Sequence, residues 1–138
     1  MENTASKAKS LKDFDLVSAC NQTFEFEYLD ANGNNTGLFL EIIGAHSEKV
    51  QKWRNNKLNQ QRQADAMNKK RGRDDLVRPI ESDIDFGIEF ISIRIAGWRG
   101  ISDPCNPENA LLLCTINPEL MQQVAQHSEN LANFTKSK

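Results

Sequence analysis

One loop of the sequence has the spacing of a metal-binding loop. Asp30, Asn32 and Asn34 place oxygen atoms at the first, third and fifth positions of an EF-hand pattern. Glu41 falls at its last position, but the position where the sharp bend needs glycine holds Asn35. Both flanks also have the pattern of strands, so we interpret the loop as a hairpin turn. We expect no metal and no other cofactor.

A second possible chemistry is a cysteine nucleophile activated by histidine. Cys114 and His127 fall in neighbouring predicted helices, where such a pair could form. No third residue is placed to orient the histidine, and no oxyanion donor stands out. We therefore predict that the chain is not an enzyme, and that His127 is a core or interface residue. The cysteines, which include Cys20 and Cys105, lack Cys-x-x-Cys spacing, so we expect reduced thiols and no zinc site.

Length and charge narrow the class of protein further. The chain has 138 residues and a net charge of -2, which gives no general attraction to nucleic acid or anionic lipid. Its N-terminus lacks the apolar core of a signal peptide, and no segment is apolar enough to cross a bilayer. We expect a flexible tail over residues 1–12 and a single domain over residues 13–138.

Residues 23–46 are predicted to form a β-hairpin. The segment between the tail and this hairpin begins with residues 13–17, whose pattern is too short to distinguish a strand from a turn. Phe24, Phe26 and Tyr28 alternate with glutamates, as in a strand with one buried face. Asn- and Gly-rich turn chemistry and a second apolar run then follow.

A long helix is predicted over residues 47–71. Ser47 is a suitable N-cap, and Gly72 is a natural stop. The segment is poor in apolar residues, so it cannot lie flat on a core along its whole length. It projects into solvent, packs against another chain, or is partly disordered.

Charge is distributed unevenly around this helix. Residues 47–73 hold nine Lys or Arg and two Asp or Glu, whereas residues 74–89 hold six Asp or Glu and one Arg. A basic helix can follow nucleic-acid phosphates. The acidic segment that comes next could neutralise it, and aromatic residues for base stacking are not interleaved with the cations. A solvated face and a protein-contact surface therefore remain the main alternatives.

Residues 82–134 are predicted to form a helical core. The apolar run 84–95 has isoleucines at helical spacing as far as Trp98, although its first apolar residues alternate as in a strand. We favour a helix, because the helical stripe is longer and Ser82 can cap it. Gly97 is then expected to end this helix, with Trp98 packing back on it.

Two further helices are predicted from a repeated signal. Asn106-Pro107-Glu108 and Asn117-Pro118-Glu119 each combine an N-capping side chain with a proline at the first helical position. The first helix is expected to be short and buried. The second is expected to bury one stripe, formed by Leu120, Val124, Leu131 and Phe134. The fold class is therefore α+β: an N-terminal β-hairpin followed by a mainly helical body, with one long polar helix.

This order of features resembles the small tail assembly chaperones of tailed bacteriophages. The similarity covers roughly residues 23–135 and is sharpest from Arg94 to Pro118. The motifs that carry it are Phe-Glu-Phe-x-Tyr at 24–28, Gly-Trp-x-Gly-Ile at 97–101, Pro-Glu-Asn-Ala at 107–110 and Asn-Phe at 133–134. The resemblance implies a non-enzymatic protein that binds tape-measure and tail-tube proteins in the host cytoplasm and keeps them soluble until they polymerise. It also implies absence from the finished virion.

We expect partner contacts at a few large side chains. Trp98 is the candidate for helix docking, and Trp53 or Met67 for contact with a partner or with a second copy. Two alternatives remain: a permanent structural component of a tail or neck, and a nucleic-acid-binding regulator that uses residues 49–73.

Overall fold

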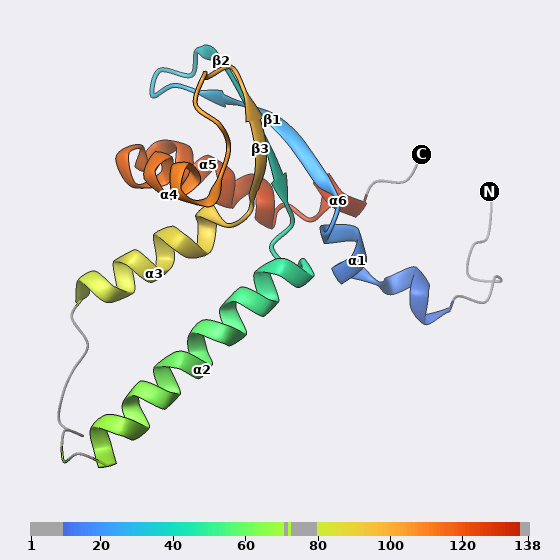
Figure 1. Cartoon of the computed structure of the whole chain (residues 1–138). Helices are drawn as coiled ribbons and strands as arrows, with labels where there is room; N and C mark the ends of the chain where they lie inside the picture. Colours follow the sequence, from blue (N-terminus) through green and yellow to red (C-terminus); the bar gives the residue numbers. More distant parts are fainter. Residues whose placement is uncertain (1–9, 71, 73–79, 136–138) are drawn as a thin grey trace.

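The structure is a computed structural model (Figure 1), and it describes residues 10–70, 72 and 80–135, without the side chains of 80–82. The helices are η2 (Leu11–Phe14, a 3-10 helix), α1 (Leu16–Cys20), α2 (Glu48–Lys70), α3 (Ile80–Ser92), α4 (Pro107–Ile116), α5 (Pro118–Glu129) and α6 (Ala132–Thr135). The strands are β1 (Thr23–Leu29), β2 (Asn35–Ile43) and β3 (Ile95–Arg99). One sheet packed against helices makes the protein α+β, as the sequence predicts.

The start of the described chain is helical. Residues 13–17 form the end of η2, the N-cap Asp15 and the start of α1, so a strand there is wrong. Asp15 explains the helix, because its carboxylate accepts hydrogen bonds from the Ser18 backbone N–H (3.0 Å) and hydroxyl (2.8 Å). Of the predicted flexible tail, residues 1–9 lie outside the described residues, and Leu11 already belongs to η2.

The predicted β-hairpin is confirmed. β1 and β2 pair antiparallel, with Phe26 opposite Leu40. The Asp30 carboxylate oxygen accepts the backbone N–H groups of Asn32 and Asn34, both at 2.9 Å, and Gly33 has a φ of +83°. Asp30 thus stabilises the turn, because its side chain accepts hydrogen bonds from backbone N–H groups that have no carbonyl partner in the hairpin ladder.

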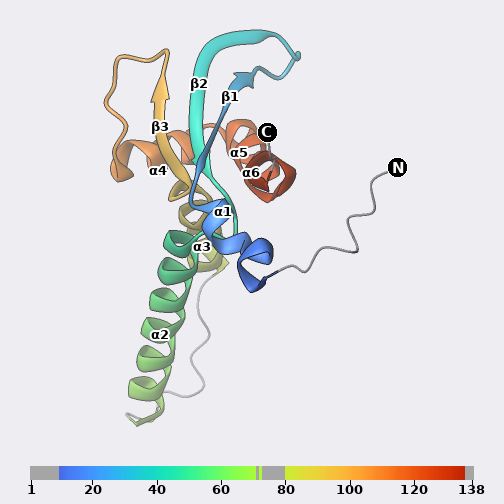
Figure 2. The same cartoon turned by 90° about the vertical axis from the view of Figure 1, so that its right-hand side faces the viewer.

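The sheet has three strands in the order β1-β2-β3, and its two faces differ. Helices α4, α5 and α6 lie against one face (Figures 1 and 2). The other face carries charged side chains, among them Arg99 and Glu25. On that exposed face the Arg99 guanidinium donates to both carboxylate oxygens of Glu25, at 3.1 and 3.3 Å. It also covers the ring of Phe39, with Cζ 3.9 Å from the ring centroid.

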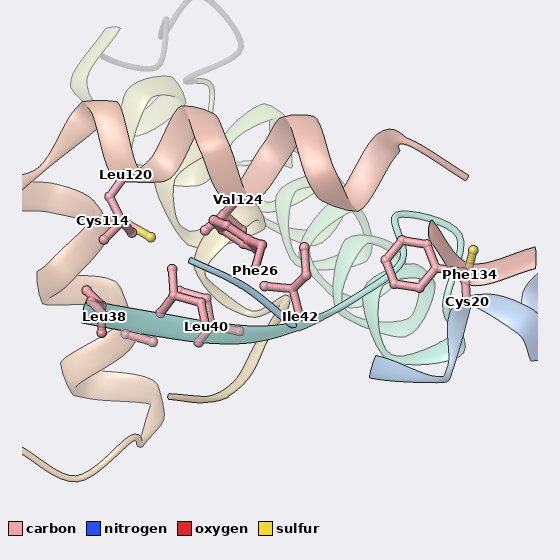
Figure 3. Packing of buried hydrophobic residues seen from close by; sticks show 11 residues of the cluster. Cys20, Phe26, Leu38, Leu40, Ile42, Cys114, Leu120, Val124 and Phe134 are labelled. Atoms are coloured by element: carbon pink, nitrogen blue, oxygen red, sulfur yellow. The ribbon is translucent and has the colours of Figure 1, made fainter. Parts of the chain in front are cut away.

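The hydrophobic core lies between the inner face of the sheet and the helices (Figure 3). Strand β2 supplies its centre, because the alternate side chains Leu38, Leu40 and Ile42 all point inward. The buried residues from the other elements are Cys20, Phe26, Ile95, Ala110, Cys114, Leu120, Val124 and Phe134. The predicted burial of Leu120, Val124 and Phe134 is therefore confirmed.

One charged side chain lies inside this body. Arg94 is only 2% exposed. Its guanidinium donates to the Phe90 carbonyl and to the Ser128 hydroxyl, both at 3.3 Å, and lies 3.7 Å from the Glu129 carboxylate. Burial lowers the pKa of Arg94, and Glu129 partly offsets that effect. These bonds join α3 to α5.

The predicted long helix is confirmed as α2. The Ser47 hydroxyl accepts the Val50 backbone N–H at 3.4 Å, and Gly72, with a φ of +75°, donates its N–H to the Lys69 carbonyl. Only Val50 is buried in this helix. Figures 1 and 2 show its C-terminal half extending away from the sheet, as the shortage of apolar residues requires.

Helix 84–95 is only partly correct. α3 ends at Ser92, and the chain then enters β3, in which Trp98 pairs with Leu40 of β2. Gly97 is therefore not a helix cap but a strand residue opposite Glu41. Pairing with β2 overrides the helical spacing, because an exposed edge of β2 gains backbone hydrogen bonds that a longer helix could not give it.

The two Asn-Pro-Glu signals are confirmed as helix starts. The side-chain oxygen of Asn106 accepts the Asn109 N–H at 2.8 Å, and that of Asn117 accepts the Leu120 N–H at 3.1 Å. The single last helix is wrong, because the chain breaks at Asn130 into α5 and α6. The break leaves the last carbonyl groups of α5 without helical partners, and the Asn133 side-chain amide donates to one of them, the His127 carbonyl, at 3.0 Å.

Candidate protein-binding surface

The structure places the three predicted contact residues in three separate parts of the molecule. Trp98 lies in β3, half-buried against the core, and its Nε1–H donates to the Asp103 carbonyl at 2.8 Å. It therefore holds the loop after β3 and does not pack back on α3 as a helix residue. Met67 lies on the outer half of α2 and is 48% exposed.

Trp53 joins α2 to α3 within the chain. Its ring centroid lies 5.1 Å from that of Phe86 and 5.6 Å from that of Phe90. Lys57, one turn further along α2, pairs with Glu89 of α3 at 3.6 Å. Trp53 thus fastens the first half of α2 to the body, and it is only half-buried there.

The possible Cys–His nucleophile finds no support in the geometry. Cys114 is 1% exposed, and burial raises its pKa to about 11, so the thiolate needed for attack is scarce near neutral pH. The His127 ring stacks on Phe26 with centroids 4.1 Å apart. Among the described residues, no group of three or more His, Cys, Asp or Glu could hold a metal ion.

The clearest candidate site is an apolar surface on α3 and α4. Four large apolar side chains are exposed there: Ile84 (55%), Leu111 (37%), Leu112 (56%) and Ile116 (68%). We call this set the α3–α4 apolar face. It arises because Ala110 to Cys114 are all apolar, while Ala110, Leu113 and Cys114 turn toward the core and Leu111 and Leu112 do not. The remaining apolar side chains of α4 must then face outward.

A groove runs beside this face. A cavity of about 440 Å³ lies where α2 begins, α3 ends and α4 begins, and its lining includes Ile93, Ile95, Cys105, Ala110 and Leu111. A second cavity, of about 290 Å³, is lined by Asp85, Ile88, Glu89, Leu111 and Thr115. Glu89 and Leu111 line both cavities, so the two form one groove along α3 and α4.

Charged side chains of both signs line the groove. α3 and α4 together carry five acidic residues, four on α3 and one on α4, and no Lys or Arg. Glu108 lines the groove at the start of α4, and Asp85 lines it near the other end. Lys49 also lines the first cavity, and Lys57 is paired with Glu89. The groove therefore has a mainly apolar lining, with Glu89 where its two cavities meet and charged side chains of both signs around it.

Sequence reasoning missed these exposed residues, although a signal was present. Leu111 was expected to be buried, yet it is 37% exposed, and Leu112 and Ile116 were not singled out. The signal is that α4 is apolar around most of its circumference. Such a helix on a small domain is either enclosed on all sides or left with an exposed apolar face.

The basic helix α2 is a weaker candidate for a nucleic-acid surface. Its cationic residues are Lys49, Lys52, Arg54, Lys57, Arg62, Lys69 and Lys70. At about 3.6 residues per turn this spacing distributes them around the whole circumference. A helix that follows a phosphate backbone needs its cations on one side.

Comparisons with known proteins come out negative. No protein-family model, curated protein or solved structure matches this chain. Over residues 10–70, 72 and 80–135, no helix has both the length and the apolar character to span a membrane. The assignment of the candidate site is therefore based on its geometry alone.

Proposed function

We propose that this protein works by binding another protein, as a non-enzymatic tail assembly chaperone of a tailed bacteriophage. The observation that carries the proposal is the α3–α4 apolar face. Its members are between 37% and 68% exposed on neighbouring helices, beside a groove with an apolar lining. Clustered exposed apolar side chains with a polar border are typical of protein-contact sites. The sequence resemblance supplies the kind of partner.

In this role the face covers apolar surface on tape-measure or tail-tube subunits in the host cytoplasm until those subunits polymerise. Apolar contact is suited to temporary protection, because it needs no matched set of hydrogen bonds. The charged exterior of α2 would keep the complex from aggregating. No cofactor is required, and the protein would leave before the virion is complete.

Co-expression with tail-tube and tape-measure proteins tests the proposal. The expected result is that at least one of them moves from the insoluble to the soluble fraction. Leu112→Asp and Ile116→Asp should abolish this rescue, because each puts a charge into the apolar face. Leu58→Asp is the matched control, since Leu58 is 43% exposed on α2, outside the groove. No rescue of any tail protein, or equal loss with the control, would contradict the proposal.

A structural component of the tail or neck is the alternative, and it would use the same contact surface. The two roles differ in whether the protein remains in the particle. Mass spectrometry of purified virions separates them: stoichiometric amounts of this chain would favour the structural component, and its absence would favour the chaperone.

A further inference from the structure

We propose, on the basis of the protein-binding function above, that a second copy of this chain covers the α3–α4 apolar face while no partner protein is bound. The two copies use the same patch, so that Leu112 of each lies against Ile116 of the partner subunit. The pair must separate before the face can take a different protein. Self-association thus regulates the site, because the dimer and the partner protein compete for one surface.

The size of the face suits a pair that forms reversibly. Its side chains are 55%, 37%, 56% and 68% exposed, which amounts to about two whole aliphatic side chains, or on the order of 300 Å² of apolar area. Because only a little more than half of a typical interface is apolar, this corresponds to roughly 500–600 Å² on each copy. Specific pairs begin at about 1,000–1,200 Å² in total, and those of this size are weak and transient. The area is therefore enough for a dimer but not for a permanent one.

The chemistry of the face suits a copy of itself. α4 carries one charged residue, Glu108 at its start, so the helix is uncharged around Leu112 and Ile116. These two side chains are four residues apart on one side of α4, and they are isomers of equal size. A two-fold axis between them matches each with the other. Two copies can therefore pack there without bringing like charges into the contact.

The charges at the border of the face do not oppose this pairing. Asp85, next to Ile84 in the chain, lines a cavity together with Lys57. Glu108 lines another cavity together with Lys49. Both signs are thus present at the border, so two identical borders do not repel each other as two purely acidic ones would.

Two other pairs of exposed apolar residues fit the face less well. Leu58 and Met67 of α2 are nine residues apart, which places them on opposite sides of a helix with about 3.6 residues per turn. Leu11 and Phe14 of η2 could enter the face of another copy, but such a head-to-tail contact leaves one face uncovered at the end of every assembly. The symmetric contact covers the faces of both copies at once.

Sedimentation velocity of the full chain, over a range of about 1 to 500 µM, tests the inference. The protein should shift from monomer to dimer with a dissociation constant above about 1 µM, and it should not grow beyond the dimer, because a symmetric contact closes. The fluorescence per chain of the dye ANS, which binds exposed apolar surface, should fall over the same range. A monomer at every concentration, growth beyond the dimer, or constant ANS fluorescence per chain would overturn the inference.

Variants locate the contact. Leu112→Asp and Ile116→Asp should each weaken the dimer by at least about tenfold, because each puts a charge into the apolar face. Leu58→Asp on α2 and Phe14→Asp on η2 are the controls and should leave the dimer unchanged. Thermal melts that match the unchanged chain establish that the variants are folded, and Leu112→Ala serves in place of a variant that is not. Equal weakening by either control, or none by the face variants, would contradict the assignment.

A mixture of two variants tests the symmetry. If Leu112 lies against Ile116 of the partner subunit, chains with Leu112→Asp and chains with Ile116→Lys together form one contact between opposite charges and keep one apolar contact. The mixture should then associate at least about tenfold more tightly than either variant alone. No gain on mixing would rule out the symmetric pairing.

Two outcomes separate this inference from the proposed function. If co-expression rescues a tail protein and Leu112→Asp abolishes the rescue, but the chain is a monomer throughout, the function stands and the inference is wrong. If Leu112→Asp dissociates the dimer but no tail protein is rescued, the symmetric contact stands and the chaperone function is wrong. Where both occur, the rescued tail protein should convert the dimer into a complex with one copy of this chain. A complex that keeps the dimer would overturn the competition.

Discussion

The imidazole ring of His127 stacks on the phenyl ring of Phe26, with centroids 4.1 Å and planes 27° apart. Phe24 flanks the same imidazole at 5.8 Å. Burial in this apolar site lowers the pKa of His127 below its ordinary value of 6.5. The neutral ring is therefore the form that the folded protein favours.

Stability should consequently fall on mild acidification. Because the folded pKa of His127 lies below 6.5, the unfolded chain takes up its proton first as the pH drops. The stabilisation that the neutral His127 ring gives to the folded state is complete above pH 6.5. It is lost as the pH falls from 6.5 through the pKa of His127 in the folded state, and it does not change further at pH values below that pKa. Urea unfolding at a series of pH values should show the decline.

Two substitutions, one at each histidine, test whether His127 causes this loss of stability at low pH. His127→Phe keeps a ring against Phe26 but cannot be protonated, so its profile over the same pH range should be flatter. His46→Gln is the control, because His46 is exposed, and it should keep the slope of the unchanged chain. A slope that survives His127→Phe would assign the effect to other groups.

Gly100→Ala should be strongly destabilising. Gly100 has a φ of +107°, and a Cβ there would overlap the Gly37 carbonyl oxygen. A side chain at residue 100 is therefore disfavoured twice: by the positive φ, and by the β2 backbone at Gly37, which lies too close to leave room for a Cβ. We expect a loss of at least about 2 kcal/mol in the free energy of unfolding.

Gly87→Ala is the matched control for that experiment. Gly87 lies in α3, where a Cβ would meet nothing within 4 Å. Alanine forms helix better than glycine by about 1 kcal/mol, so this variant should be more stable than the unchanged chain. Chemical denaturation of both variants gives the comparison, and similar effects of the two would contradict the role assigned to Gly100.

The features that the sequence predicts correctly are local ones. Asn106 and Asn117 bond to N–H groups three residues further on, and Asp30 bonds within its own turn. Each such bond depends on the residue type and on its immediate neighbours. The hairpin and the starts of α2, α4 and α5 are therefore predictable without knowledge of the rest of the fold, whereas the expected cap at Ser82 is wrong, because α3 begins at Ile80.

The features that the sequence does not predict depend on distant parts of the chain. β3 exists because β2 offers it an edge, and Gly97 fits there because the Glu41 side chain occupies the space beside it: a Cβ would lie 3.1 Å from the Glu41 Oε1 atom. The exposure of Leu112 and Ile116 likewise depends on which side of α4 the sheet covers. Neither relation is encoded in local spacing, so the candidate surface was missed.

Thiol reactivity should distinguish the three cysteines. Cys20 and Cys114 are at most 1% exposed, whereas Cys105 lines the groove. Burial raises the pKa of Cys105 above its ordinary value, so its thiol should react more slowly than a free cysteine at pH 8. With Ellman's reagent the native protein should titrate one thiol, and the unfolded chain all three. Cys105→Ser should remove the native reaction, and a remaining fast thiol would contradict this ranking.

Asn117→Ala should cost more stability than Asn106→Ala, although both residues cap a helix. Asn106 accepts one backbone N–H, and its loss should lower the free energy of unfolding by about 1 kcal/mol. Asn117 makes the same cap and also donates from its amide to the Tyr28 hydroxyl at 3.0 Å, which ties the start of α5 to β1. The second bond should add about another 1 kcal/mol.

A double-mutant cycle isolates that second bond. Tyr28→Phe removes the hydroxyl and leaves the ring in place, so the cost of Asn117→Ala measured in the Tyr28→Phe background should fall to that of Asn106→Ala. The cost of Asn106→Ala should be the same in both backgrounds, because its cap does not involve Tyr28. If the two asparagines cost the same in the unchanged chain, the bond between Asn117 and Tyr28 contributes nothing to stability. The side-chain hydrogen bonds between α5 and β1 would then be those of Gln123 with the Leu29 backbone N–H and carbonyl.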